Sequence, residues 1–161
     1  PSSSSSSRRF LDFYPEDARL VKIAAKCMSA AQSGQYNFWR CIRRSEYYAA
    51  QYAETRFCAD IMALVSLLNR RYTPYYKWVH RSILGLPVLG SLIHSKVAQL
   101  VDSNDYNEKN QIIEEISAAV INEFRTEGLS DSPSDFLLDH GPVIHGKIAD
   151  EELRNRNVWI G

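Results

Sequence analysis

Apolar residues recur every three or four positions along most of the chain, which is the period of an amphipathic helix. Pro15-Glu16-Asp17 predicts the start of the first helix, because proline suits the first turn and acidic side chains favour the positive end of the helix dipole. The apolar stripe that follows predicts an end near Gly34. A second helix is predicted over 35–44, with Trp39 and Ile42 facing inward.

The longest predicted helix runs from about residue 45 to 72. Between 57 and 68 its only polar side chains are Asp60 and Ser66, and a helix that is apolar nearly all round is typical of a central, buried position. Asp60 follows Arg56 by one turn, so the pattern predicts an ion pair within this helix.

Thr73-Pro74 predicts a helix break, because the residue before a proline avoids helical geometry and proline can begin a new helix. A short helix is predicted over 75–84. Its apolar face would consist of Tyr75, Trp78, Val79 and Ile83. Lys77 and Arg81, one turn apart, would share the other face.

Three more helices are predicted at about 87–101, 108–127 and 150–155. No strand-like alternation persists and no internal repeat is visible. The sequence therefore predicts an all-α fold, a bundle of about six or seven helices around one long buried central helix. Residues 10–161 would form this single domain, whereas the serine run in 1–9 predicts a disordered tail or linker. Because the chain starts with Pro rather than Met, we expect a fragment of a longer protein.

Composition alone is ordinary for a soluble globular protein, with 45% hydrophobic and 24% charged residues. The net charge of zero conceals an asymmetry: residues 1–101 carry 14 Lys and Arg against 6 Asp and Glu, and residues 102–161 carry 5 against 13. This pattern allows two interpretations. The two halves attract each other within one fold, or the basic half leaves a face open to an anionic ligand.

The three cysteines, Cys27, Cys41 and Cys58, are odd in number and far apart, so a disulfide framework is not expected and a reducing cytoplasm is the predicted compartment. Each lies in an apolar helical stripe, which is typical of a buried structural thiol. No apolar run approaches the ~20 residues that cross a bilayer, so no membrane partner is expected.

Signatures of catalysis are missing from the sequence. It contains no glycine-rich phosphate loop, no Gly-x-Ser-x-Gly and no Asp-x-Asp pair. Asp139, His140 and His145 could only form a weak metal site, and we expect the two histidines to cap neighbouring helices or to meet solvent. We therefore assign no catalytic residue, no metal ligand and no cofactor to this chain.

The best functional candidate is a basic and aromatic stretch, because no carboxylate occurs between Asp60 and Asp102. The predicted anion- or ligand-binding residues are Arg70, Arg71, Tyr72, Tyr75, Lys77, Trp78 and Arg81. Free backbone amides at the start of the new helix would attract an anion, and the rings would offer stacking faces. In the alternative interpretation the aromatic residues are core and the cations flank them or pair with the acidic half.

Several stretches also occur in an order seen in one known family: Phe13-Tyr-Pro-Glu-Asp17, Ala31-Gln-Ser-Gly-Gln-Tyr36, Arg56-Phe57 with Asp60, Leu68-Asn-Arg-Arg-Tyr-Thr-Pro-Tyr-Tyr-Lys-Trp78, and Val143-Ile144-His145 before Ile160-Gly161. From about Phe10 to Gly161 the chain resembles the helical C-terminal domain of a bacterial family of unknown function. Members of that family carry a nucleotidyltransferase-like N-terminal domain.

The resemblance implies an accessory domain that packs against its own N-terminal nucleotidyltransferase-like domain and closes one wall of the substrate cleft, where a nucleotide or small-molecule acceptor binds. Mg²⁺ and a nucleoside triphosphate would belong to the full-length protein. The Gly-Ser motif and metal-binding carboxylates of a catalytic module are missing here, so we expect no catalysis by this chain alone.

A second hypothesis is a protein–protein interaction module that uses the basic half and binds no small molecule. The two hypotheses predict different surfaces: a concave pocket with aromatic walls, or a flat face that is apolar at its centre. A nucleic-acid partner is not expected, because the cations lie at one helix junction rather than along an extended stripe.

Overall fold

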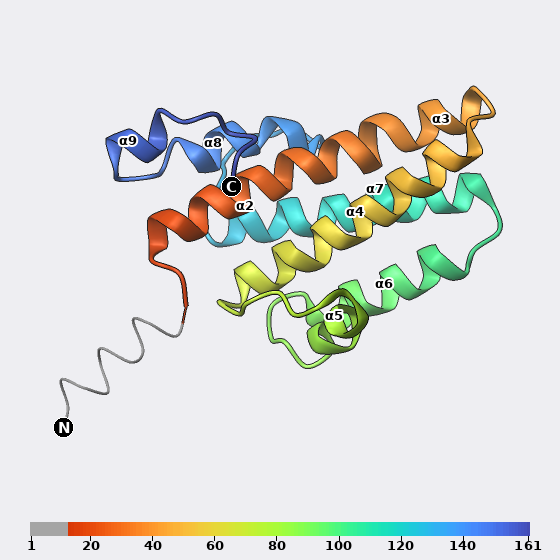
Figure 1. Cartoon of the computed structure of the whole chain (residues 1–161), viewed down its shortest axis with the longest axis horizontal. Helices are drawn as coiled ribbons and strands as arrows, with labels where there is room; N and C mark the ends of the chain where they lie inside the picture. The colour runs from red at the N-terminus through yellow and green to blue at the C-terminus, as the bar shows by residue number, and fades with distance from the viewer. Residues whose placement is uncertain (1–12) are drawn as a thin grey trace.

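The computed structural model describes residues 13–161, and these residues confirm the all-α class, since they contain helices and no strand. The predicted serine-rich tail at 1–9 lies outside them. In chain order the elements are α2 (Glu16–Ala30), the π-helix η1 (Ala31–Phe38), α3 (Trp39–Arg43), α4 (Tyr47–Leu68), α5 (Tyr76–Ile83), α6 (Gly90–Asp102), α7 (Tyr106–Thr126), the 3₁₀ turn η2 (Leu137–Asp139), α8 (Gly141–His145) and α9 (Glu151–Arg154) (Figure 1).

The predicted helix end at Gly34 is wrong, because the chain stays helical from α2 through η1 into α3. Gly34 is buried where η1 packs against α4, and a β-carbon at this position would overlap the ring of Phe57. The glycine therefore permits a close approach of two helices rather than a chain reversal. Phe38 is the buried aromatic residue here, whereas Trp39 is only half-buried.

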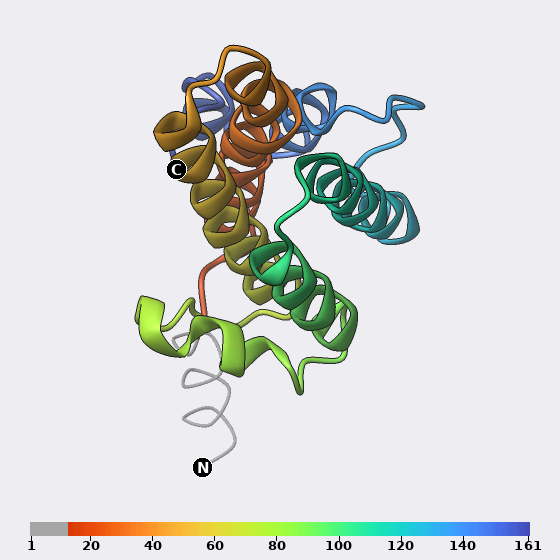
Figure 2. The same cartoon turned by 90° about the vertical axis from the view of Figure 1, so that its right-hand side faces the viewer.

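The longest helix is α4, with 22 residues, of which 14 are buried. It runs back along α2 and η1 after a short turn at 44–46, and it also contacts α5 and α6 (Figure 1). Its apolar run was visible in the sequence, and the structure places that run in the main core. Figure 2 shows α4 and the C-terminus on one side of the molecule and α7 on the other.

α4 ends at Leu68, four residues before the predicted end. Arg70 adopts a left-handed backbone with φ of +56°, and the Arg71 amide donates to the carbonyl of Ser66 at 2.9 Å. This pattern closes the last turn of a helix. The side chain of Asn69 also exchanges two hydrogen bonds of 2.8 Å with the backbone of Val88, which holds the loop before α6 against the end of α4.

The C-terminal segment, drawn in blue in Figures 1 and 2, packs along α2. The carboxylate of Asp17 accepts hydrogen bonds of 3.0 Å from the amides of Ala149 and Asp150. A β-carbon at Gly141 would overlap the side chain of Met28, so α8 lies very close to α2. Gly161, at the end of this segment, also lies beside Val21 of α2.

Candidate functional site

All seven residues predicted to bind an anion lie at the end of α4 or in and just before α5, and all seven are exposed. The expectation that Tyr75 and Trp78 share a buried face with Val79 and Ile83 is wrong for the two aromatic residues, which are 62% and 50% exposed. α5 lies at the edge of the bundle, so only a narrow stripe of it is covered (Figure 1).

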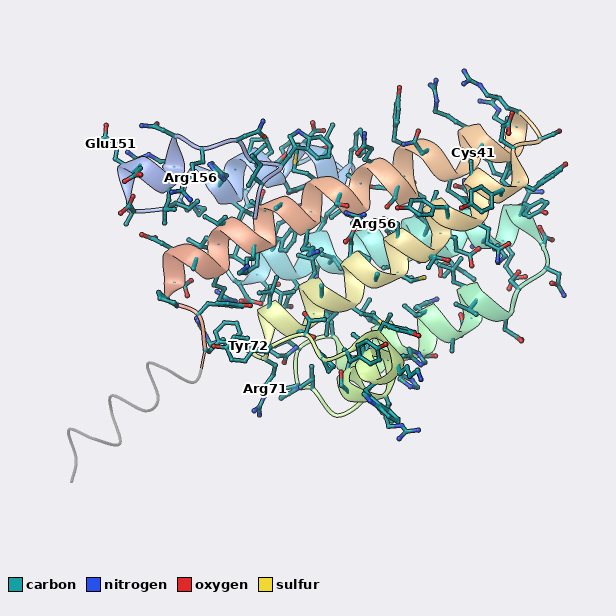
Figure 3. The ribbon with its side chains drawn as sticks, in the orientation of Figure 1. Cys41, Arg56, Arg71, Tyr72, Glu151 and Arg156 are labelled. Atoms are coloured by element: carbon teal, nitrogen blue, oxygen red, sulfur yellow. The ribbon has the colours of Figure 1, made fainter. Side chains whose placement is uncertain are left out.

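Two of the predicted cations have partners inside the chain. Arg70 pairs with Glu16 at 2.9 Å, and the guanidinium of Arg81 lies 5.2 Å from the centre of the Trp78 ring. Within residues 13–161, Arg71 and Lys77 form no ion pair. Figure 3 shows Arg71 extending away from the helices into solvent.

Tyr72 belongs to a concave site that the sequence did not reveal. Its ring packs against those of Phe13 and Tyr14, with centres 5.3 and 4.8 Å apart. A cavity of about 320 Å³ adjoins this cluster, and we call it the basic cavity; it is lined by Tyr14, Lys22, Lys26, Ala63, Leu67, Tyr72, Thr73 and Gly161. The ammonium group of Lys22 lies 4.8 Å from the centre of the Tyr14 ring.

Asp60 lies between α2 and α4, and its side chain is only 3% exposed. Arg56 Nε is 3.3 Å from Asp60 Oδ2, so the predicted ion pair is confirmed. Lys26 of α2 adds a second cation, with Nζ 3.7 Å from Oδ1. The charge of Asp60 raises the pKa of Arg56 above its ordinary value. Two half-exposed cations are therefore held beside one buried carboxylate.

A second cavity, of about 530 Å³, lies between η1 and the first half of α4, and we call it the tyrosine groove. Its lining consists of Ser29, Gln32, Ser33, Asn37, Cys41, Tyr48, Ala49, Tyr52, Ala53 and Arg56. Both cavities follow the line of contact between α2–η1 and α4, which we call the seam. Figure 3 shows Cys41, Arg56 and Tyr72 in that order along the length of α4. Arg56 lines the end of the tyrosine groove that lies nearer the basic cavity along α4.

A third cavity, of about 710 Å³, is lined mainly by residues of α4, α5, α6 and α7. Glu54 and Lys109 form an ion pair of 2.6 Å at its wall, with side chains 11% and 12% exposed. Burial, with a smaller effect of Glu54, raises the pKa of the nearby Cys58 thiol to about 12. The pair joins the start of α7 to α4, so we interpret it as structural.

His140 and His145 are both buried, so the expectation that they meet solvent is wrong, whereas His145 does cap a helix, at the last residue of α9. The His140 ring bridges the hydroxyl of Ser130 and the carbonyl of Ser134, at 2.7 Å each. Nε2 of His145 lies 2.9 Å from the carbonyl of Arg154. Burial of these rings orders the irregular C-terminal segment, and residues 13–161 contain no group of three potential metal ligands.

Sequence reasoning missed Tyr14, Lys22 and Lys26 because they come from a different part of the chain than the predicted cluster. One signal was present: Lys22 and Lys26 are one turn apart on the first helix, about two turns after the aromatic pair Phe13 and Tyr14. The partnership with Tyr72 depends on the antiparallel packing of α2 and α4, which a sequence pattern does not specify.

The fold and the seam thus define an all-α domain with a basic and aromatic face. Residues 2–79 match the family model of a domain of unknown function (DUF4037). This segment contains the complete lining of the tyrosine groove and all of the basic cavity except Gly161. Comparisons with curated proteins and with solved structures found no match. Every helix of residues 13–161 is too short or too polar to cross a membrane.

Proposed function

We propose that this chain is the substrate-side helical domain of a nucleotidyltransferase-like protein and that the basic cavity holds part of a nucleotide or of an anionic acceptor. The observation that carries the proposal is the meeting of Lys22 and Lys26 with Tyr14 and Tyr72 around one concave space. Cations attract phosphate or carboxylate groups, and aromatic rings offer flat faces to a sugar or a base. A small concave site of this kind is typical of ligand binding.

The volume of the basic cavity supports a role as one wall of a larger cleft. About 320 Å³ is the lower end of the range for small-molecule pockets, roughly 300–1,000 Å³. A nucleotide would therefore be covered only in part by this chain, and an adjoining domain would cover the remainder. Arg71, next to Tyr72 in the chain and exposed to solvent, is available to the uncovered part of such a ligand.

The proposed role is binding rather than catalysis. The chain supplies cations and rings along the seam, whereas the metal-bearing carboxylates of nucleotidyl transfer would come from the N-terminal domain, together with Mg²⁺ and the nucleoside triphosphate. In this proposal the protein is bacterial and acts in the cytoplasm. We expect no nucleotidyl transfer by the 161-residue chain alone, and turnover by the purified chain would contradict this expectation.

One observation favours the second hypothesis, an interaction module. Tyr75, Tyr76 and Trp78, at the start of α5, are 62%, 70% and 50% exposed. Aromatic residues are enriched in protein–protein interfaces, where they bury large areas at low entropic cost. In the main proposal, this surface would contact the nucleotidyltransferase-like domain; in the alternative, it would dock a separate protein and the basic cavity would stay without a ligand.

Thermal denaturation with millimolar ATP, GTP, CTP and UTP tests the proposal. A ligand at ten times its Kd stabilises the native state by about 1.4 kcal/mol, or ~3–6 °C for a chain of this size. We expect at least one nucleotide to raise the melting temperature and Lys22→Ala to abolish the shift. The double variant Lys77→Ala/Arg81→Ala tests the predicted helix-break site instead. A shift that survives Lys22→Ala and disappears in the double variant would place the anion at α5; no shift with any nucleotide would favour the interaction module.

A further inference from the structure

We infer that the tyrosine groove binds a planar ring with hydrogen-bonding edges, such as a nucleobase, and that the anionic part of the same ligand extends along the seam toward Arg56 and Lys26. The inference rests on the proposed function and deepens it, because it assigns a second subsite and an orientation to the ligand. The groove has one aromatic wall and one amide-rich wall, and a cationic end that leads to the basic cavity.

The aromatic wall consists of Tyr48 and Tyr52, which are one turn apart on α4. They are 85% and 59% exposed, and within the described part of the chain neither ring stacks on another aromatic side chain. The adjacent lining residues are Ala49 and Ala53, whose small side chains leave room beside the rings. Two free faces next to a hollow are what a stacked base requires.

The opposite wall is formed largely by the π-helix. Gln32 and Asn37 line the groove, and in residues 13–161 their amide groups have no hydrogen-bond partner. Gln35 of the same element is fully engaged: its amide group binds Glu114 and the backbone of 135 and 137. An amide supplies a donor and an acceptor, which match the edge of a base. π-Helical turns also occur frequently at functional sites.

One end of the tyrosine groove is cationic. Arg56 lines the groove, its side chain is 50% exposed, and Asp60 fixes its position. Lys26 and then Lys22 continue the row of cations along α2 into the basic cavity. Three cations against one buried carboxylate leave two positive charges along the seam. Along this side of the seam, Asn37 and Lys22 mark the far ends of the two cavities, about 22 Å apart at 1.5 Å per residue, so a ligand that occupies both cavities is extended.

Calorimetric titration of the full 161-residue chain with ATP, GTP, CTP, UTP and inorganic tripolyphosphate tests this orientation. We expect at least one nucleotide to bind roughly tenfold or more tightly than tripolyphosphate, because the ring adds stacking. In the double variant Tyr48→Ala/Tyr52→Ala, we expect the affinity for this nucleotide to fall to that for tripolyphosphate. The affinity for tripolyphosphate itself should not change. Tyr106→Ala is the matched control, since Tyr106 is 43% exposed and lines a different cavity.

The outcomes separate the inference from the proposal beneath it. If nucleotides and tripolyphosphate bind equally, or if the double tyrosine variant changes neither affinity, the ring subsite is wrong while anion binding at the seam stands. If neither class of probe binds the wild-type chain, both are wrong. Melting temperatures without ligand show that the variants are folded, and Tyr52→Phe should restore the affinity that Tyr52→Ala loses, because stacking needs the ring and not the hydroxyl.

Discussion

Asp60 shows at the scale of one residue what a sequence can and cannot predict. Its spacing from Arg56 predicted an ion pair within one helix, and the structure confirms it. The second partner, Lys26, comes from α2 and could not be read from local spacing. Because the carboxylate is buried between two helices, it holds α2 against α4 and positions the cations of the seam.

Replacement of Asp60 by Asn should therefore lower the free energy of unfolding. The change removes a buried charge and leaves two cations facing each other, and because both cations are half-exposed, we expect a loss of about 1–3 kcal/mol. Urea denaturation measures the loss. Asp131→Asn is the control, since Asp131 is exposed and should change stability by less than about 0.5 kcal/mol. Equal effects of the two substitutions would show that the Asp60 ion pairs do not stabilise the fold.

The three cysteines should differ in reactivity toward a thiol-alkylating reagent. Cys58 is buried and its pKa is raised to about 12, so at pH 8 only ~10⁻⁴ of it is thiolate. Burial also raises the pKa of Cys27. Cys41 is half-buried at the rim of the tyrosine groove, so we expect mass spectrometry to find it modified first. Labelling of Cys27 or Cys58 in the folded protein before Cys41 would contradict the packing described for α2 and α4.

Glu127 should make stability depend on pH. Its pKa is raised from 4.5 to about 7, because burial and the neighbouring Glu123 carboxylate disfavour its charge. Between these values the folded chain holds a proton that the unfolded chain has released, so this group's contribution to stability falls as pH rises to 7. Glu127→Gln should therefore gain stability relative to wild type from pH 5 to pH 8, by about 1 kcal/mol after solvent screening. The melting temperature of each protein, measured from pH 5 to pH 8, tests this. The same pH dependence in both proteins would refute the assignment to Glu127.

At the scale of the element, the sequence predicted which segments are helical better than it predicted where each helix ends. The apolar run of α4 and the break at Thr73-Pro74 were visible as patterns. The end of α4 was not, because the left-handed turn at Arg70 lacks the glycine that usually marks it. The π-helix was also missed, because Gly34 was interpreted as a helix end. Gly34 instead makes room for the ring of Phe57, and this contact depends on how α4 packs against η1.

Gly34→Ala tests this reading of η1. The new methyl group would overlap the fully buried ring of Phe57, so we expect a loss of about 1–3 kcal/mol from overpacking, measured by chemical denaturation. Gly85→Ala is the matched control. A β-carbon there has no neighbour within 4 Å, so that substitution should be neutral or slightly stabilising. If Gly34→Ala were as stable as Gly85→Ala, the close approach of η1 and α4 would be wrong.

At the scale of the whole molecule, the charge asymmetry has two consequences. Arg19–Glu127 and Lys96–Glu115, at 3.7 and 2.6 Å, join the basic half to the acidic half, as the first interpretation requires. Along the seam, however, Lys26 and Arg56 of the basic half stay partly exposed to solvent. The second interpretation, a basic face open to an anionic ligand, requires such exposed cations.

The candidate site could be predicted only in part. Composition and the run from Arg70 to Arg81 indicated anion binding, and Tyr72 does line a cavity. The other wall of that cavity comes from α2, about 50 residues earlier in the chain, so its cations and its ring required the tertiary fold. Of the two interpretations of Tyr75 and Trp78, the one that made them core residues is wrong, because both are exposed. The period of a helix shows which residues share a face and not what covers that face.

The central claim is that an anionic ligand binds at the seam, in the basic cavity. Backbone amide chemical shifts of the 161-residue chain, recorded during titration with the four nucleoside triphosphates, test it most directly. We predict that the largest changes fall on residues of the seam, at 14–26 and 72–73 around the basic cavity and at 29–56 in the tyrosine groove, and that Lys22→Ala removes those around the basic cavity. Changes confined to the cavity beside Glu54 and Lys109, or no change at millimolar nucleotide, would contradict the claim.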